Sequence, residues 1–165
     1  MRRNNTRKIA LGGMLAAVAV VIMCLGGLIP VATYICPVLC CMTAYLVLMF
    51  CGNRIAWAWF CVVVILSVLM GPDKEAAVVF LFLGYYPIIK GRIEQLQLAL
   101  LVKVAFFNVS IMTAYFVLIR LLGMDQIAQE NAQFGVIGLV VLLVLGNITF
   151  LLLDRLLDRM ARKNR

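Results

Sequence analysis

Polar side chains inside the long apolar runs are the residues of this chain best placed to do chemistry. Lys103 is the only ionisable residue well inside such a run, and Asn147 lies in a later one. Ionisable groups within a bilayer are costly and are therefore candidates for function. A contact between Lys103 and Asn147 would line a polar cavity or a gate. Alternatively, Lys103 snorkels along its own stem toward the membrane surface, which is the interpretation we prefer.

Asn108 is a second polar residue of the run that contains Lys103. Asn108 and Tyr115 are seven residues apart and therefore share one face of a helix. Asn108 suits either a bound solute or a hydrogen bond to a neighbouring helix. Ser110 and Thr113 require neither, because small hydroxyls can bond to the backbone of their own helix.

A dense cluster of charges, Asp73, Lys74 and Glu75, separates two apolar runs. We expect a helix over residues 72–90, because Pro72 suits the first helical position and acidic side chains are stabilised in the first turn. Together with Arg120, the cluster would lie on the outer side of a membrane and hold a small polar solute. The alternative is that these are ordinary solvated loop charges.

Small residues recur at a spacing of four near the N-terminus. Gly12 and Ala16 form one such pair, and Gly13 and Ala17 form another. Small residues at this spacing let a second helix approach closely within a membrane. The sequence leaves open whether that helix belongs to this chain or to another protein.

Several classes of function lack the residues they need. The chain has no histidine, so it contains neither an HExxH motif nor a Ser-His pair, and it has no nucleotide-binding glycine-rich loop. No CxxC pair occurs, and the cysteines fall mostly in apolar segments, where they act as packing residues. We therefore expect no enzyme, no metal and no other cofactor. The six cysteines are Cys24, Cys36, Cys40, Cys41, Cys51 and Cys61.

The composition is that of an integral membrane protein. Of the 165 residues, 65% are hydrophobic and only 13% are charged, and the mean hydropathy is +1.09. The apolar runs predict an all-α bundle of six transmembrane helices in a single domain, residues 1–165. The first run is too long for a typical signal peptide and is expected to stay in the protein. The expected helices are residues 9–29, 35–51, 55–71, 74–90, 96–121 and 134–154.

The basic residues predict the orientation of this bundle. Six crossings from a cytoplasmic N-terminus place twelve of the 15 Lys and Arg residues on the inner side and only Lys74 and Arg120 outside. Both termini are then cytoplasmic in a multi-pass protein of the cell membrane. This distribution explains the net charge of +8 without a nucleic-acid partner.

The layout resembles the S components of energy-coupling factor transporters, which are small bacterial membrane proteins of six helices that capture vitamins or other micronutrients. The resemblance covers the whole chain. It includes the basic start Arg7-Lys8-Ile9-Ala10-Leu11, the first helix rich in alanine and glycine, Pro30 behind it and the basic exit from the last helix.

The resemblance implies partners and sites. The first helix would dock on a transmembrane coupling subunit, which works with ATPase subunits, through Gly12, Gly13, Ala16 and Ala17. The solute would be held toward the outer side, by Asp73, Lys74, Glu75, Asn108 and Arg120. In this chain glycine takes the first position of each small pair, where the family has alanine.

Two further classes of function remain open. In the first, the chain is a membrane scaffold or accessory protein without transport activity, and its polar residues only join helices. In the second, it is a self-contained channel or carrier, which the single buried charge and the lack of an evident inverted repeat disfavour.

Overall fold

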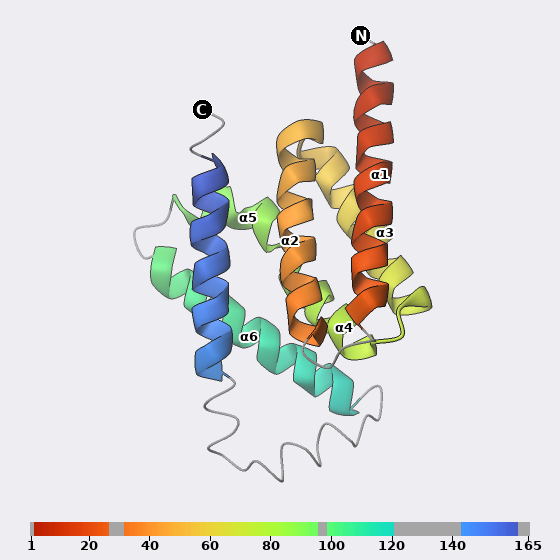
Figure 1. Ribbon diagram of the computed structural model, residues 1–165. Coiled ribbons are helices and arrows are strands. Elements are labelled where there is room, and N and C mark those ends of the chain that lie inside the picture. The colour runs from red at the N-terminus through yellow and green to blue at the C-terminus, as the bar shows by residue number, and fades with distance from the viewer. Residues whose placement is uncertain (1, 27–31, 96–98, 121–142, 162–165) are drawn as a thin grey trace. The chain divides into compact units, whose positions relative to one another are not determined.

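The computed structural model describes residues 2–26, 32–95, 99–120 and 143–161, and all of the regular structure in these ranges is helical (Figure 1). The chain divides into two compact units, Met1–Leu96 and Gln97–Arg165. Each is described by itself below. The expected single domain of residues 1–165 stays a prediction.

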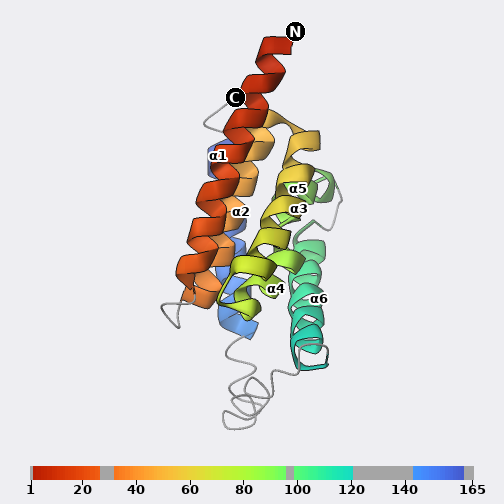
Figure 2. The ribbon, with the colours of Figure 1, turned by 90° about the vertical axis from the view of Figure 1, so that its right-hand side faces the viewer.

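The first helix, α1, begins much earlier than expected. It spans Arg2–Gly26, seven residues ahead of the predicted start. The basic segment before Ile9 contains neither glycine nor proline, so nothing in it stops the helix from continuing beyond the apolar run. In Figures 1 and 2, α1 projects past the turn that joins the next two helices of its unit.

The second helix, α2, spans Ala32–Cys51 and contains Pro37. The helix predicted over residues 35–51 also included this proline, and α2 begins three residues earlier than predicted. The proline lies close to the start of the helix, where its missing N–H leaves only the carbonyl of Thr33 without an i+4 donor. A break near a helix start is cheaper than one in the middle, so the helix includes the proline.

A single residue joins α2 to α3 (Asn53–Met70). Gly52 has a φ of 92°, a backbone conformation that residues with a Cβ rarely adopt. Its N–H donates to the Leu48 carbonyl at 3.1 Å, and its carbonyl accepts from the N–H of Ala56 at 3.0 Å. The glycine thus closes one helix and opens the next.

The expected fourth helix is in fact two. α4 spans Lys74–Leu83 and α5 spans Tyr86–Ile93. Pro87 lies in the first turn of α5, where its lack of an N–H is tolerated. The same lack leaves the Leu83 carbonyl without its usual helical donor. The continuous helix predicted over residues 72–90 is therefore interrupted at Gly84 and Tyr85.

The start of α4 also differs from the prediction. Asp73 was predicted to lie in the first turn of the helix, but it is the N-cap. Its Oδ1 accepts from the N–H of Ala76 at 3.0 Å. Pro72 therefore lies outside the helix and not at its first position. Aspartate is among the best N-cap residues, and this explains the shift of two residues.

The core of the first unit consists of small residues on α1 and α2 and aromatic residues on α3 and α4. Ala19, Cys40 and Ala44 are fully buried. Phe60 packs against Phe80 with ring centroids 5.8 Å apart. Small side chains allow α1, α2 and α3 to lie close together.

The second unit contains α6 (Ala99–Arg120) and a C-terminal helix over residues 143–161, drawn in blue in Figure 1. The prediction for this last helix was 134–154. Residues 134–142 lie outside the described ranges, and the helix continues seven residues past Asp154. Asp154 therefore lies within the helix and not at its end.

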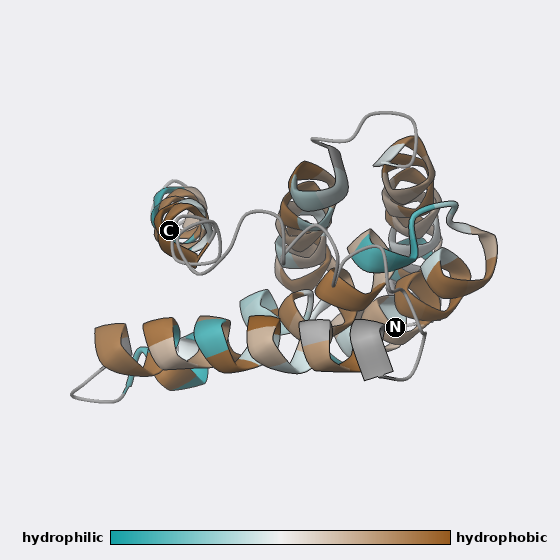
Figure 3. Cartoon of the chain, turned by 90° about the horizontal axis from the view of Figure 1, so that it is seen from below, coloured by the Kyte–Doolittle hydropathy of each residue, from teal (hydrophilic) through white to brown (hydrophobic). Residues whose placement is uncertain are grey.

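Among the residues that the structure describes, four helical segments are long and apolar enough to cross a membrane, and a shorter apolar stretch, Leu100–Ala114, lies within α6. Most of their residues are hydrophobic, as the brown colour in Figure 3 shows, and large apolar side chains such as Met14 and Leu69 are exposed. The described part of the chain is thus that of an all-α membrane protein. The four segments are Thr6–Gly26, Thr33–Cys51, Asn53–Met70 and Lys74–Ile93.

Candidate functional site

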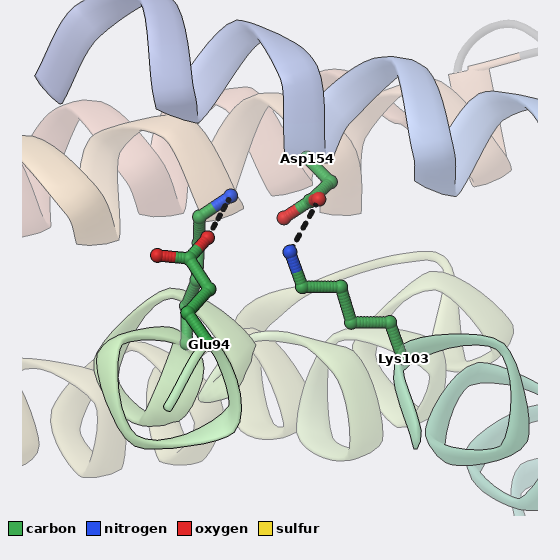
Figure 4. A network of polar contacts seen from close by, with 4 residues as sticks. Glu94, Lys103 and Asp154 are labelled. Carbon is green, nitrogen blue, oxygen red and sulfur yellow. Dashed lines mark hydrogen bonds and ion pairs between the residues drawn. The ribbon is translucent and has the colours of Figure 1, made fainter. Parts of the chain in front are cut away.

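The second unit contains a buried ion pair between its two described helices. Lys103 Nζ lies 2.7 Å from Asp154 Oδ2, and the two side chains are only 9% and 10% exposed (Figure 4). A buried charge is tolerated when it is paired at short range. Asp154 was not predicted as a site residue. The only signal in the sequence was its position at the edge of the last apolar run.

One turn further along the same helices, an aromatic contact follows. The rings of Phe107 and Phe150 are stacked at 5.0 Å, with an interplanar angle of 28°. Gly146 lies against this contact, because a Cβ built on it would be 2.9 Å from Phe107 Cζ. The glycine therefore permits the close approach of the two helices at this level.

A pair of amides forms the third contact between these helices. Asn108 and Asn147 donate to one another's side-chain oxygens at 3.3 and 3.2 Å. Each Nδ2 also donates to the carbonyl four residues earlier in its own helix, at 2.8 Å. This pairing satisfies most of the hydrogen-bonding capacity of both amides.

These contacts differ from the predicted pairing. The structure brings Lys103 to Asp154 and Asn147 to Asn108, whereas one of the two interpretations of the sequence paired Lys103 with Asn147. Lys103 is 8% exposed, which also disagrees with the preferred interpretation of a lysine that snorkels to the surface. Thr113 donates to the Val109 carbonyl of its own helix at 2.7 Å, and this confirms its predicted local role.

The three charges at the start of α4 all have partners within the first unit. Asp73 caps the helix. Lys74 Nζ donates to the carbonyls of Val68 and Gly71, at 2.6 and 3.0 Å, at the C-terminal end of α3. Glu75 accepts from the hydroxyl of Tyr34 at 3.0 Å. The cluster therefore ties the ends of α2, α3 and α4 together.

Arg120 is the last residue of α6, and its side chain lies outside the described residues. Its predicted role in holding a solute stays a prediction. The predicted solute-binding residues thus fall into two groups, the three charges of the first unit and Asn108 of the second.

The two small-residue pairs of α1 have different environments. Gly12 and Ala16 are buried, and a Cβ on Gly12 would lie 3.3 Å from Ile55 Cγ2 of α3. Gly13 and Ala17 are exposed, and a Cβ on Gly13 would meet nothing within 4 Å. One pair therefore packs inside the unit, and the other leaves a shallow face open on its surface.

Three buried cysteine thiols donate to backbone carbonyls of other helices. Cys40 donates to the carbonyl of Ala19, and Cys51 to that of Lys8, at 3.5 and 3.2 Å. Cys41 donates at 3.7 Å to the carbonyl of Leu83, which Pro87 leaves without its helical donor. All six cysteines are free thiols, and these three add hydrogen bonds to their predicted packing role.

The α5 helix carries a further charge pair. Lys90 is buried, and its Nζ lies 3.2 Å from Glu94 Oε1, one turn later in the same helix (Figure 4). Glu94 is 40% exposed at its side chain, so the pair reaches the surface of the unit. A pair spaced by four residues at a helix end stabilises that end modestly.

Comparison with known proteins identifies no relative. No protein family, no curated protein and no solved structure matches the chain.

Proposed function

We propose that this protein is the substrate-binding membrane subunit of a micronutrient uptake transporter of the energy-coupling factor type. The observation that carries the proposal is the exposed face of Gly13 and Ala17 on α1. The neighbouring pair, Gly12 and Ala16, already serves the packing of the unit. The exposed pair is free to admit a helix of a coupling subunit at close range.

The topology proposed for this subunit has six crossings with both termini in the cytoplasm. Four apolar spans support part of it, and the basic residues at the two ends of the chain support the orientation. A reporter fused after Arg165 is expected to be active only in the cytoplasm. Activity on the outer side would overturn the orientation and the solute-capture proposal that depends on it.

The solute is proposed to be a small polar molecule captured from the outer side. The amides of Asn108 and Asn147 offer hydrogen-bond donors and acceptors within a largely apolar helix pair. A solute that replaces one amide with its own polar groups would keep the remaining amide satisfied. Release into the cell would require a partner ATPase complex, because the chain has no nucleotide-binding motif of its own.

Co-purification from the native membrane tests the docking face. We expect a coupling subunit and ATPase subunits to accompany the tagged protein, and Ala17→Leu to remove them. Val18→Leu, on a neighbouring exposed position of α1, is the matched control and should retain them. The proposal fails if no such subunit accompanies the wild-type protein, or if both variants behave alike.

A second candidate function is a membrane scaffold without transport activity. It is favoured by the intramolecular bonds of Asp73, Lys74 and Glu75, which give these charges a purely structural use. A native mass spectrum of the purified protein separates the two candidates. A small molecule that is bound by the wild type and lost in Asn108→Ala supports the transporter subunit, whereas its absence supports the scaffold.

A further inference from the structure

The first three helices of the chain carry basic residues and no acidic ones. No Asp or Glu occurs before Asp73, whereas Arg7, Lys8 and Arg54 all lie in this part of the sequence. Asp73 follows the far end of α3, 19 residues after Arg54. A carboxylate that pairs with any of these three cations must therefore come from a later part of the chain or from another molecule.

Two contacts bring these cations to one end of the first unit. The Cys51 thiol donates to the Lys8 carbonyl, which places the end of α2 beside α1. Gly12 packs against Ile55, which places the start of α3 beside α1 as well. Arg54 adjoins Ile55, and Lys8 is one turn before Gly12. Lys8 and Arg54 are thus offset by roughly one helical turn along the unit.

The three side chains are exposed at this end. None of them forms an ion pair with a carboxylate of the residues that the structure describes. The first turn of α3 adds further positive potential, because no side chain caps the backbone N–H groups that follow Gly52. We name Arg7, Lys8 and Arg54 the basic end.

The basic end lies at the edge of an apolar surface. The spans Thr6–Gly26 and Asn53–Met70 both begin within two residues of these cations. Ile9 and Leu11 on α1 are exposed, as is Trp57 one turn after Arg54. Tryptophan is enriched at the membrane–water boundary. Charged groups and exposed apolar groups thus adjoin at this end of the unit.

We propose that the basic end binds the phosphate of an anionic phospholipid, whose acyl chains then lie against the exposed apolar side chains of α1 and α3. Guanidinium groups bind phosphate oxygens through paired, charge-assisted hydrogen bonds. A free phosphate offers the same headgroup chemistry. The adjoining apolar surface favours the lipid, because a lipid has acyl chains that cover this surface as well as a phosphate that binds the cations. This site is independent of the proposed transport function.

The test uses the full-length protein in neutral detergent micelles and native mass spectrometry. We expect phosphatidylglycerol to bind in preference to phosphatidylcholine, and binding to weaken as salt rises. Removal of each cation should lower the affinity about fivefold. This factor corresponds to the attraction of about 1 kcal/mol between one basic residue and an anionic membrane surface. The triple variant Arg7→Gln, Lys8→Gln, Arg54→Gln should bind both lipids equally.

Matched controls separate the site from net charge. The double variant Arg155→Gln, Arg159→Gln removes two exposed cations from the C-terminal helix and should retain the preference. Thermal stability in lipid-free detergent verifies that each variant is folded. Equal binding of both lipids by the wild type, or an unchanged preference in the triple variant, overturns the proposal. Glycerol phosphate that competes as strongly as the lipid would show a free-phosphate site instead.

Discussion

Replacement of Lys103 by methionine measures the cost of leaving Asp154 without its ion-pair partner. Methionine keeps most of the length and apolar surface of the lysine stem but removes the ammonium group that lies 2.7 Å from Asp154. The carboxylate would then be buried without this partner. Removal of one member of a buried pair typically costs about 3–5 kcal/mol. We expect a loss in this range, because both side chains are at most 10% exposed.

The double variant Lys103→Met, Asp154→Leu separates loss of a partner from loss of attraction. At 2.7 Å, two unit charges attract by about 6 kcal/mol at an effective dielectric constant of about 20. Much of this is offset by the cost of removing both charges from water, so an apolar pair is often neutral or stabilising. We expect the double variant to recover most of the stability that the single variant loses.

Pulse proteolysis with proteinase K along an SDS titration measures these differences in the full-length protein. A C-terminal tag reports the intact fraction at each SDS concentration. Arg155→Met serves as the control, because it removes an exposed cation from the same helix and should change the stability by less than about 0.5 kcal/mol. A single variant as stable as this control, or a double variant less stable than the single, would refute the reasoning.

Three further substitutions test the contacts that shape the two units. Asp73→Ala should cost about 1 kcal/mol through loss of the N-cap, whereas Asp73→Asn should retain it; equal losses in thermal unfolding would contradict the capping role. Gly146→Ala should destabilise by about 1 kcal/mol, because overpacking outweighs the gain in helix propensity, and Gly91→Ala, which has open space around it, should not. Cys41→Ala should cost about 1 kcal/mol in the wild type and less in Pro87→Ala, which restores the missing N–H. An unchanged cost in a double-mutant cycle would show that the thiol does not replace that donor.

The membrane class and most helices follow from the sequence, since apolar run length alone predicts α2, α3 and α6 to within three residues at each end. The break before Pro87 was not predicted, because an apolar run reads as continuous and a thiol from α2 satisfies the freed carbonyl. The hydropathy pattern likewise did not predict that the basic start of the chain is helical.

The polar contacts were harder to predict than the helices. Lys103 and Asn147 were both recognised, but their partners depend on the alignment of two helices separated by residues 121–142, and no local pattern gives that alignment. A shift of one turn would be enough to exchange Asn147 for another partner. The different environments of the two small pairs on α1 depend in the same way on which face meets α3.

The single glycine between α2 and α3 also bears on how the chain enters a membrane. A connection of one residue leaves no polar loop that can remain behind while one helix inserts alone. The two helices are therefore expected to leave the translocation channel together, as one preformed hairpin. An epitope inserted beside Gly52 should impair biogenesis even where the mature protein has space for it.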